Sequence, residues 1–153
     1  MKKIQKLIGP EDVFLDVEAL DGQSAMSAVA DCLSASDALD QDLLLAALEE
    51  REKLGSTSVG DGFAIPHAKI RGLEKIIVIL LRFQAPVLFN GKDLVKMVAA
   101  VVSPPDQPAA HLQVLSQIAR LLKHEDFRQR LLEARSPEET VEIVAETATR
   151  EGL

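Results

Sequence analysis

A histidine that follows a glycine-rich loop is the side chain in this sequence best suited to chemistry. The loop, residues 55–65, carries three glycines and three consecutive hydroxyl residues, and Pro66 separates it from His67. The proline ring fixes its own φ and disfavours a helical conformation at Ile65, so the approach to His67 is predicted to be extended. Imidazole is both largely neutral and nucleophilic near pH 7. The pattern therefore predicts a displayed nucleophile.

The loop itself has the composition of an anion site. Gly60 and Gly62 permit positive φ, which lets backbone N–H groups converge, while Ser56 and Thr57 add hydroxyl donors. We predict a phosphohistidine site in which these four residues bind phosphate. The alternative is structural, because a single histidine in a turn is commonly a solvated residue or one that caps the core.

These residues also resemble a known family. The runs Leu-Gly-Ser-Thr at 54–57 and Gly-Asp-Gly-Phe-Ala-Ile-Pro-His at 60–67 are similar to the active-site segment of type-2 enzyme IIA (EIIA) domains of the phosphoenolpyruvate-dependent phosphotransferase system. The similarity covers nearly the whole chain, and the Leu-Gly-Ser-Thr opening looks most like the nitrogen-regulatory branch. The resemblance implies a phosphocarrier that accepts a phosphoryl group from the phosphohistidine of the carrier protein HPr on Nε2 of His67.

Two further residues are assigned to the reaction. Arg51 lies in the last turn of a helix expected to end at Gly55, where its guanidinium reaches the loop and is the candidate to stabilise charge on the phosphoryl oxygens. His111 lies in the first turn of a helix opened by Pro108, where the helix dipole disfavours imidazolium. The resemblance places a second histidine there to hydrogen-bond the phosphate, and a surface cap is the alternative. His124 is expected to be an ordinary exposed residue.

Two positions depart from the family pattern. Asp61 stands where asparagine is common between the glycines, and Ser58 stands where glycine is common after the Ser-Thr pair. A carboxylate at position 61 would weaken phosphate binding unless the side chain turns away from the loop, where water screens its charge.

Other chemistries lack their residues. The three histidines are not spaced to share a helix face, and no cysteine pair or carboxylate completes a ligand motif, so no metal is expected. The sequence has no Gly-x-Ser-x-Gly run and no Walker A motif, so no cofactor or nucleotide is expected either. Cys32 cannot form an internal disulfide and is predicted to lie in the core.

The charge is unevenly distributed. The formal net charge is −7, which argues against general affinity for nucleic acid or anionic membrane. Residues 51–96 nevertheless hold eight basic and four acidic side chains, which suits a phosphoryl group or a phosphorylated partner; solvated lysines on strand edges are the alternative. The apolar runs are too short to span a bilayer, and the stretch 4–8 is too interrupted to serve as a secretory signal. We expect a cytoplasmic protein that does not insert into a membrane.

The 153 residues are predicted to form one type-2 EIIA domain over 1–153. The first expected elements are a strand at 13–17, a helix at 23–34 capped by Asp21, and a second helix after the N-cap Asp40. Three strands follow, at 76–81, at 87–89 between Pro86 and Asn90-Gly91, and at 94–102. The last third is expected to form helices after Pro108, around 127–132 and after Ser136. The apolar run 76–81 does not alternate, which indicates a strand covered on both faces. This order predicts an α/β fold, a three-layer α/β/α sandwich with a mixed sheet, which the resemblance also implies.

Two helices carry apolar stripes that are predicted to face the core. The residues assigned to the stripe of the second helix are Leu43, Leu44, Ala47 and Leu48. Those assigned to the stripe of the helix after Pro108 are Leu112, Leu115, Ile118, Ala119 and Leu122. Both sets follow the three- and four-residue spacing of one helix face.

Three functions remain open at this stage. The first is nitrogen-related regulation, in which the phosphorylation state of His67 controls binding to regulatory target proteins. The second is a sugar-specific enzyme IIA of the fructose or mannitol type, which passes its phosphate to a IIB domain. The third is a non-catalytic IIA-like binding module, against which the joint presence of Arg51, His67 and His111 argues.

Overall fold

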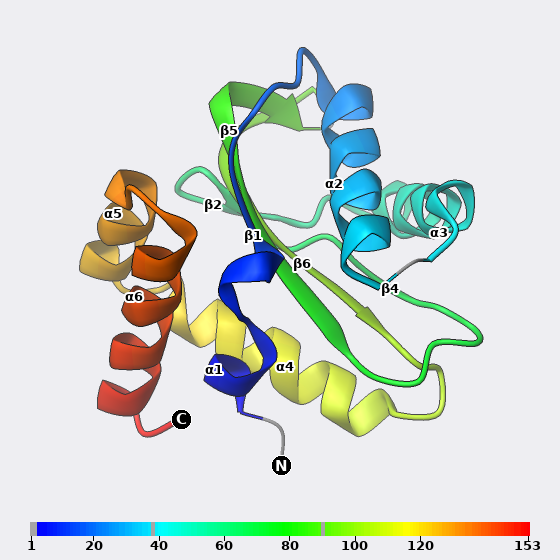
Figure 1. Cartoon of the computed structure of the whole chain (residues 1–153). Coiled ribbons are helices and arrows are strands. Elements are labelled where there is room, and N and C mark those ends of the chain that lie inside the picture. Colours follow the sequence, from blue (N-terminus) through cyan, green and yellow to red (C-terminus); the bar gives the residue numbers. More distant parts are fainter. Residues whose placement is uncertain (1–2, 38, 90) are drawn as a thin grey trace.

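A mixed β-sheet between two layers of helices forms the frame of the protein (Figure 1). The computed structural model describes residues 3–37, 39–89 and 91–153. Within these residues the elements are α1 (Ile4–Leu7), η1 (Pro10–Asp12), β1 (Val13–Val17), α2 (Gly22–Asp37), α3 (Gln41–Lys53), β2 (Ser58–Gly60), β3 (Phe63–Ala64), β4 (His67–Lys69), β5 (Ile77–Phe89), β6 (Asp93–Ser103), α4 (Pro108–Leu121), α5 (Glu125–Glu133) and α6 (Pro137–Arg150). This architecture confirms the predicted three-layer sandwich.

The strand order brings the histidine segment beside the end of β6. The sheet runs β1-β5-β6-β3-β2, and β4 also pairs with β6. β5 and β6 are antiparallel, while β1 is parallel to β5 and both β3 and β4 are parallel to β6. In the β4–β6 register His67 lies opposite Val101 and Lys69 opposite Ser103. The functional segment is therefore held by the central strand of the sheet.

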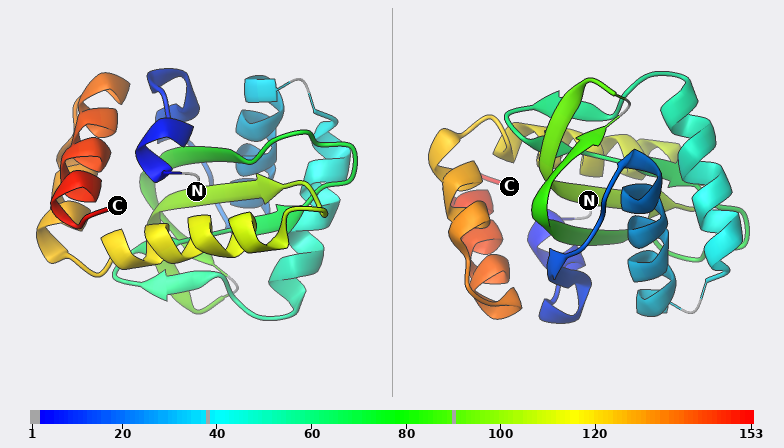
Figure 2. Two further views of the ribbon diagram at one scale, coloured as in Figure 1. Left: turned by 90° about the horizontal axis from the view of Figure 1, so that it is seen from below. Right: turned by 90° about the horizontal axis from the view of Figure 1, so that it is seen from above.

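Both faces of the sheet are covered, as the continuous apolar run predicts. Val78 and Leu80 of β5 pack with α4, α5 and α6, whereas Ile77 and Ile79 pack with α2 and α3. Figure 2 shows the two helix layers on opposite sides of the strands. Because successive side chains of a strand point to opposite faces, one unbroken apolar strand supplies both cores.

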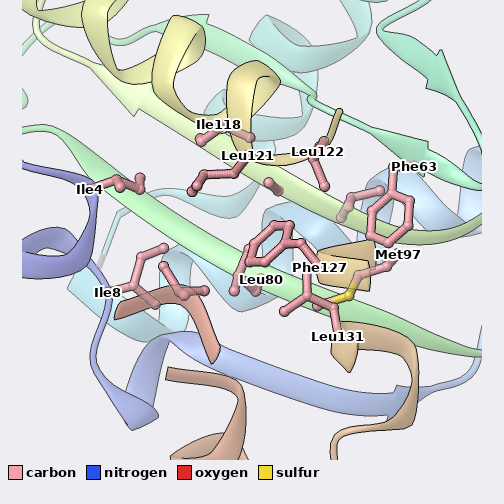
Figure 3. Close-up of a pocket in the computed structure, with 13 residues that line it drawn as sticks. Ile4, Ile8, Phe63, Leu80, Met97, Ile118, Leu121, Leu122, Phe127 and Leu131 are labelled. Carbon is pink, nitrogen blue, oxygen red and sulfur yellow. The ribbon is translucent and has the colours of Figure 1, made fainter. Parts of the chain in front are cut away.

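The core on the side of α4 to α6 contains one small void. Figure 3 shows Phe127 and Leu131 of α5 pointing toward Leu80 and Met97 of the sheet. The void measures about 20 Å³ and is lined by apolar side chains. A space of this size and chemistry suits no ligand and has no polar groups to hold a water. We regard it as ordinary packing.

The predicted helix starts are confirmed. Asp21, Asp40 and Ser136 each accept a hydrogen bond from a backbone N–H in the first turn of the helix that follows. Such bonds satisfy N–H groups that have no partner inside the helix. Three helices are thereby fixed at the positions that the sequence indicates.

The prediction of separate strands at 76–81 and 87–89 is wrong, because the structure has one strand, β5. The pairing of β5 with β6 is irregular between Arg82 and Val87. Pro86 lies inside this irregularity, where a residue without an N–H breaks no regular ladder. Asn90 of the predicted turn lies outside the described residues.

Two predicted core positions are exposed instead. Leu43 of α3 is 53% exposed and Leu112 of α4 is 66% exposed. The residues that α4 buries are His111, Val114, Gln117, Ile118 and Leu121. The buried stripe of α4 is thus turned by about one residue from the predicted one. Periodicity alone does not choose between two adjacent apolar stripes.

Candidate functional site

The site begins at the C-terminal end of α3. The helix ends at Lys53, and Gly55 follows with φ of 154°, which confirms the predicted stop. Arg51 therefore lies in the last turn, and its Nη1 donates to the carbonyl oxygen of Gly55 at 2.9 Å. This bond holds the guanidinium at the helix end, where a positive charge is favourable.

The loop after α3 is tied back to the same helix. Both carboxylate oxygens of Glu52 accept from Thr57, one from the backbone N–H at 2.9 Å and one from the hydroxyl at 2.7 Å. The backbone N–H of Ile65 then donates to the carbonyl oxygen of Thr57. Thr57 is buried, and its hydroxyl is used inside the fold. Ser56 is exposed, and its Oγ accepts from the N–H of Ser58.

Gly60 is the last residue of β2 and leads into the turn to β3, which contains Gly62. Both have φ of 86°, and Asp61 between them has φ of 57°, so the turn is built from three left-handed residues. The Asp61 carboxylate approaches Arg128 of α5 at 3.9 Å. Its charge is thus directed at α5. Neither glycine is among the described residues that line the hollow around His67.

The hydrogen bonds of His67 show which ring nitrogen carries the proton and which carries the lone pair. Its Nδ1 lies 2.8 Å from the carbonyl oxygen of Ile65. A carbonyl oxygen only accepts, so Nδ1 carries the proton and Nε2 carries the lone pair. The Nε–H of Arg51 donates to that lone pair at 3.1 Å.

His111 lies beside His67. The two ring centroids are 5.6 Å apart and the ring planes are tilted by 58°. His111 is the fourth residue of α4 and is buried. Its Nδ1 is hydrogen-bonded to Oγ of Ser103 at 2.6 Å. A surface cap, the alternative for His111, is therefore excluded.

Both histidines are biased toward the neutral form. Burial lowers the pKa of His67, and the nearby Arg51 charge lowers it further, while the Ile65 hydrogen bond and Glu52 act in the opposite direction. Burial also lowers the pKa of His111, and His67 and Lys69 add to this effect. Near pH 7 the site thus presents two uncharged imidazoles next to a guanidinium.

The two histidines and Arg51 line one open hollow of about 510 Å³. In Figure 2 α3 and the start of α4 lie near the same end of the sheet, and side chains of both helices line this hollow. Lys69 also lines it, and the side chains of Leu54 and Leu112, 85% and 66% exposed, stand at its rim. The hollow combines a nucleophilic nitrogen, two cations, the carboxylate of Glu50 and exposed apolar side chains.

Sequence reasoning missed three contributors to this site. Lys69 stands two residues after His67 in β4, so strand alternation could have placed both on one side. Leu112 was assigned to the core. Ser103 gave no signal, because its contact with His111 depends on how the chain turns between β6 and α4.

Two properties of the described part of the chain bear on other functions. No group of three or more histidine, cysteine, aspartate or glutamate side chains is placed there to hold a metal ion. None of its helices combines the length and apolar character required to cross a bilayer.

Comparison with known proteins agrees with this geometry. Residues 6–147 match the family described as phosphoenolpyruvate-dependent sugar phosphotransferase system, EIIA 2. A nitrogen regulatory protein of Bradyrhizobium diazoefficiens is 31% identical over 144 residues, which cover 93% of this chain and 94% of that protein. The fructose-specific EIIA component of Haloferax volcanii is 38% identical over 109 residues, or 70% of this chain and 71% of that component.

A solved structure has the same fold. The crystal structure of the nitrogen regulatory protein IIA-Ntr of Neisseria meningitidis superimposes with a TM-score of 0.85 at 27% identity, covering 92% of this chain and 98% of the other. The match of the family over nearly the whole chain, together with this likeness, confirms the resemblance read from the loop. The chain belongs to the EIIA type-2 family of the phosphoenolpyruvate-dependent sugar phosphotransferase system.

Proposed function

We propose that the protein is a phosphocarrier that accepts a phosphoryl group on Nε2 of His67 from the phosphohistidine of an HPr-type protein. One observation carries the proposal: the bond from Nδ1–H to the Ile65 carbonyl leaves the Nε2 lone pair in an open hollow beside Arg51. In the transfer, the P–N bond of the donor breaks, its electron pair returns to the donor's imidazole, and a new P–Nε2 bond forms at His67. The donor ring leaves as a neutral imidazole with a proton on its other nitrogen, and His67 keeps its own proton on Nδ1. The phosphoryl group and the electrons are thus accounted for, and the step uses neither a metal nor a nucleotide.

Arg51 has two tasks in this reaction. In the free protein its Nε–H occupies the lone pair that must attack, so it has to leave Nε2 when the donor docks. The anchor of its Nη1 at Gly55 keeps the guanidinium in reach during this shift. Its remaining donors then stabilise the charge that spreads over the phosphoryl oxygens.

His111 is the second donor to the phosphoryl group in this proposal. Burial lowers the pKa of His111, so its imidazole is neutral near pH 7. A neutral imidazole has one N–H, which it can donate to the phosphoryl group. Phosphate contacts by Ser56, Thr57, Gly60 and Gly62 stay predictions, since none of these lines the hollow and the Thr57 hydroxyl is bound to Glu52.

The test is stoichiometric phosphorylation with phosphoenolpyruvate, enzyme I and HPr. Wild type should gain one phosphate that is labile in acid and stable in base, and His67→Ala should gain none. His124→Ala is the matched control, because His124 pairs with Glu151 on the surface and lines no part of the hollow. A full phosphate on His67→Ala refutes the assignment of the nucleophile.

We further propose that the phosphorylation state of His67 governs binding to regulatory proteins in the cytoplasm, in a nitrogen-related role. The similarity to a nitrogen regulatory protein, which covers 93% of this chain, supports the regulatory role. The hollow is lined by two cations, Arg51 and Lys69, and one anion, Glu50, so a dianion on His67 changes its formal charge from +1 to −1. This reversal changes the partners that can dock.

The second candidate is a sugar-specific enzyme IIA that passes its phosphate to a IIB domain, favoured by the 38% identity to a fructose-specific EIIA component. Pull-downs under phosphorylating conditions distinguish the two. The regulatory role predicts partners that differ between wild type and His67→Ala and converge when phosphoenolpyruvate is omitted. Rapid transfer to a fructose- or mannitol-type IIB domain, with no such partner recovered, would assign the protein to sugar transport. A non-catalytic module predicts no phosphate on wild type at all.

A further inference from the structure

Ser103 is a buried hydroxyl that the proposed reaction does not yet use. It is the last residue of β6, is fully buried, and pairs in the sheet with Lys69 of β4. Its Oγ lies 2.6 Å from Nδ1 of His111. The bond joins the strand that holds β4 to the helix that carries His111, so it fixes one histidine with respect to the other.

The direction of this hydrogen bond follows from the chemistry of the two groups. A hydroxyl has one proton to donate and lone pairs to accept, whereas the carbonyl that orients His67 only accepts. In the described part of the chain, the bond to His111 is the only hydrogen bond of the Ser103 hydroxyl. If Nδ1–H of His111 donated to Oγ, the hydroxyl proton would be buried without an acceptor, which is unfavourable. The hydroxyl therefore donates, and Nδ1 accepts.

We propose that Ser103 is a positioning residue that holds His111 in the tautomer with its proton on Nε2. The two histidines then have opposite tautomers: His67 carries a lone pair at Nε2, and His111 carries a proton at Nε2. An imidazole that carries a phosphoryl group needs donors nearby, because the phosphoryl oxygens only accept. This part of the inference rests on the proposed function, while the tautomer itself does not.

The electrostatics of the site are consistent with this role. The pKa of His111 is lowered by burial and by the neighbouring His67 and Lys69, so His111 is not expected to be an imidazolium near pH 7. A neutral histidine donates from one nitrogen only, and which nitrogen it is depends on the partner of the other. Ser103 is that partner.

Nitrogen-15 NMR of the histidine side chains tests the tautomer directly, with single histidine variants for assignment. In unphosphorylated wild type, at a pH where both rings are neutral, we expect the proton of His111 on Nε2 and that of His67 on Nδ1. A proton on Nδ1 of His111 overturns the inference, whatever the protein does with phosphate.

The role in transfer is tested with Ser103→Thr and Ser103→Val, which have the same shape and differ in the hydroxyl. We expect Ser103→Thr to accept phosphate from phospho-HPr at near the wild-type rate and to keep the His111 tautomer. Ser103→Val should be slower by about tenfold or more, since small misplacements of a catalytic group can cost up to about 10²-fold. Equal rates for the two variants overturn the positioning role.

Thermal unfolding of both variants shows whether the added methyl group is tolerated. If neither variant folds, Ser103→Ala, which removes the hydroxyl without adding volume, is compared with wild type by the same two measurements. A wild-type protein that takes no phosphate but has the expected tautomers refutes the proposed function and supports the Ser103–His111 assignment.

Discussion

The phosphoryl group proposed for His67 would form beside His111, because the ring centroids of the two histidines are 5.6 Å apart. His111→Ala should still accept phosphate on His67, because the nucleophile and Arg51 remain. Its rate should fall by about 10²–10³, the usual cost of losing one aligned donor to a developing charge. Rapid-quench measurement of transfer from phospho-HPr gives this rate. Complete loss in a folded His111→Ala protein would reverse the roles of the two histidines.

Arg51 is connected to two groups at once, and this geometry suits a guanidinium only. Its Nε donates to Nε2 of His67 and its Nη1 to the carbonyl oxygen of Gly55. Lysine keeps the charge but has no fork of donors, so Arg51→Lys should transfer phosphate more slowly than wild type. The loss should stay below the ~10²–10³-fold typical of removing a donor completely.

Arg51→Gln is the matched variant that removes the charge. The Arg51 charge is one cause that lowers the pKa of His67, after burial. That pKa should therefore rise in Arg51→Gln and stay lowered in Arg51→Lys, as followed by NMR titration. Equal transfer rates for wild type and Arg51→Lys would reduce Arg51 to a cap of its helix.

At the level of elements, hydrogen bonds between α3 and the loop after it position the segment that leads to His67. Glu52 clamps Thr57 through the backbone N–H and the hydroxyl. Thr57→Val removes one of these bonds while conserving shape, and should lower the free energy of unfolding by about 1.5–3 kcal/mol, as for a hydrogen bond to a charged group. Urea denaturation measures the change, and Thr57→Ser, which keeps the hydroxyl, is the control. A stable Thr57→Val protein with slowed transfer would instead support the phosphate contact predicted from the sequence.

The elements that the sequence predicts well are those with strong local signals. The strand at 13–17 and the starts of three helices follow from apolar runs and capping residues, and they are confirmed. The errors come from tertiary context. Pro86 reads as a strand boundary, yet an irregular register lets β5 run through it. The buried stripe of α4 includes His111, whose hydrogen bond with Ser103 at the end of β6 is a tertiary contact that no periodicity reveals.

The same distinction holds for the site. His67 and Arg51 are recognisable from the loop motif and a helix end, and His111 from the family resemblance. The structure brings all three to one hollow. Glycines and hydroxyl residues are less informative, because the same residue types build an anion site and a tight turn. Gly60 and Gly62 take left-handed φ at the β2–β3 turn, and their distance from the hollow follows from that pairing.

At the scale of the molecule, the cationic segment 51–96 does not form one positive surface. Arg82 donates to the carbonyl oxygens of Leu131, Leu132 and Ala134 at the end of α5, and so serves the packing of that helix. Lys53 pairs with Glu50. Of the eight basic residues of this segment, only Arg51 and Lys69 line the hollow. Within the hollow, the positive charge that can attract a phosphorylated partner thus comes from these two side chains and is partly offset by Glu50.

His111, which is buried, and His67, which is half-buried, also link the stability of the whole fold to pH. Their pKa values are lowered in the folded protein, and in the unfolded chain they return to about 6.5. Between the lowered values and 6.5, the unfolded state binds more protons than the folded state, so the free energy of unfolding rises with pH and is lost on acidification. The urea midpoint should thus be lower at about pH 5.5 than at about pH 7.5. The double variant His67→Gln, His111→Gln lacks both titrations and retains His124, so its midpoint should change less across this range. A wild-type midpoint that is equal at both pH values, or a double variant that loses as much stability as wild type, would contradict the linkage.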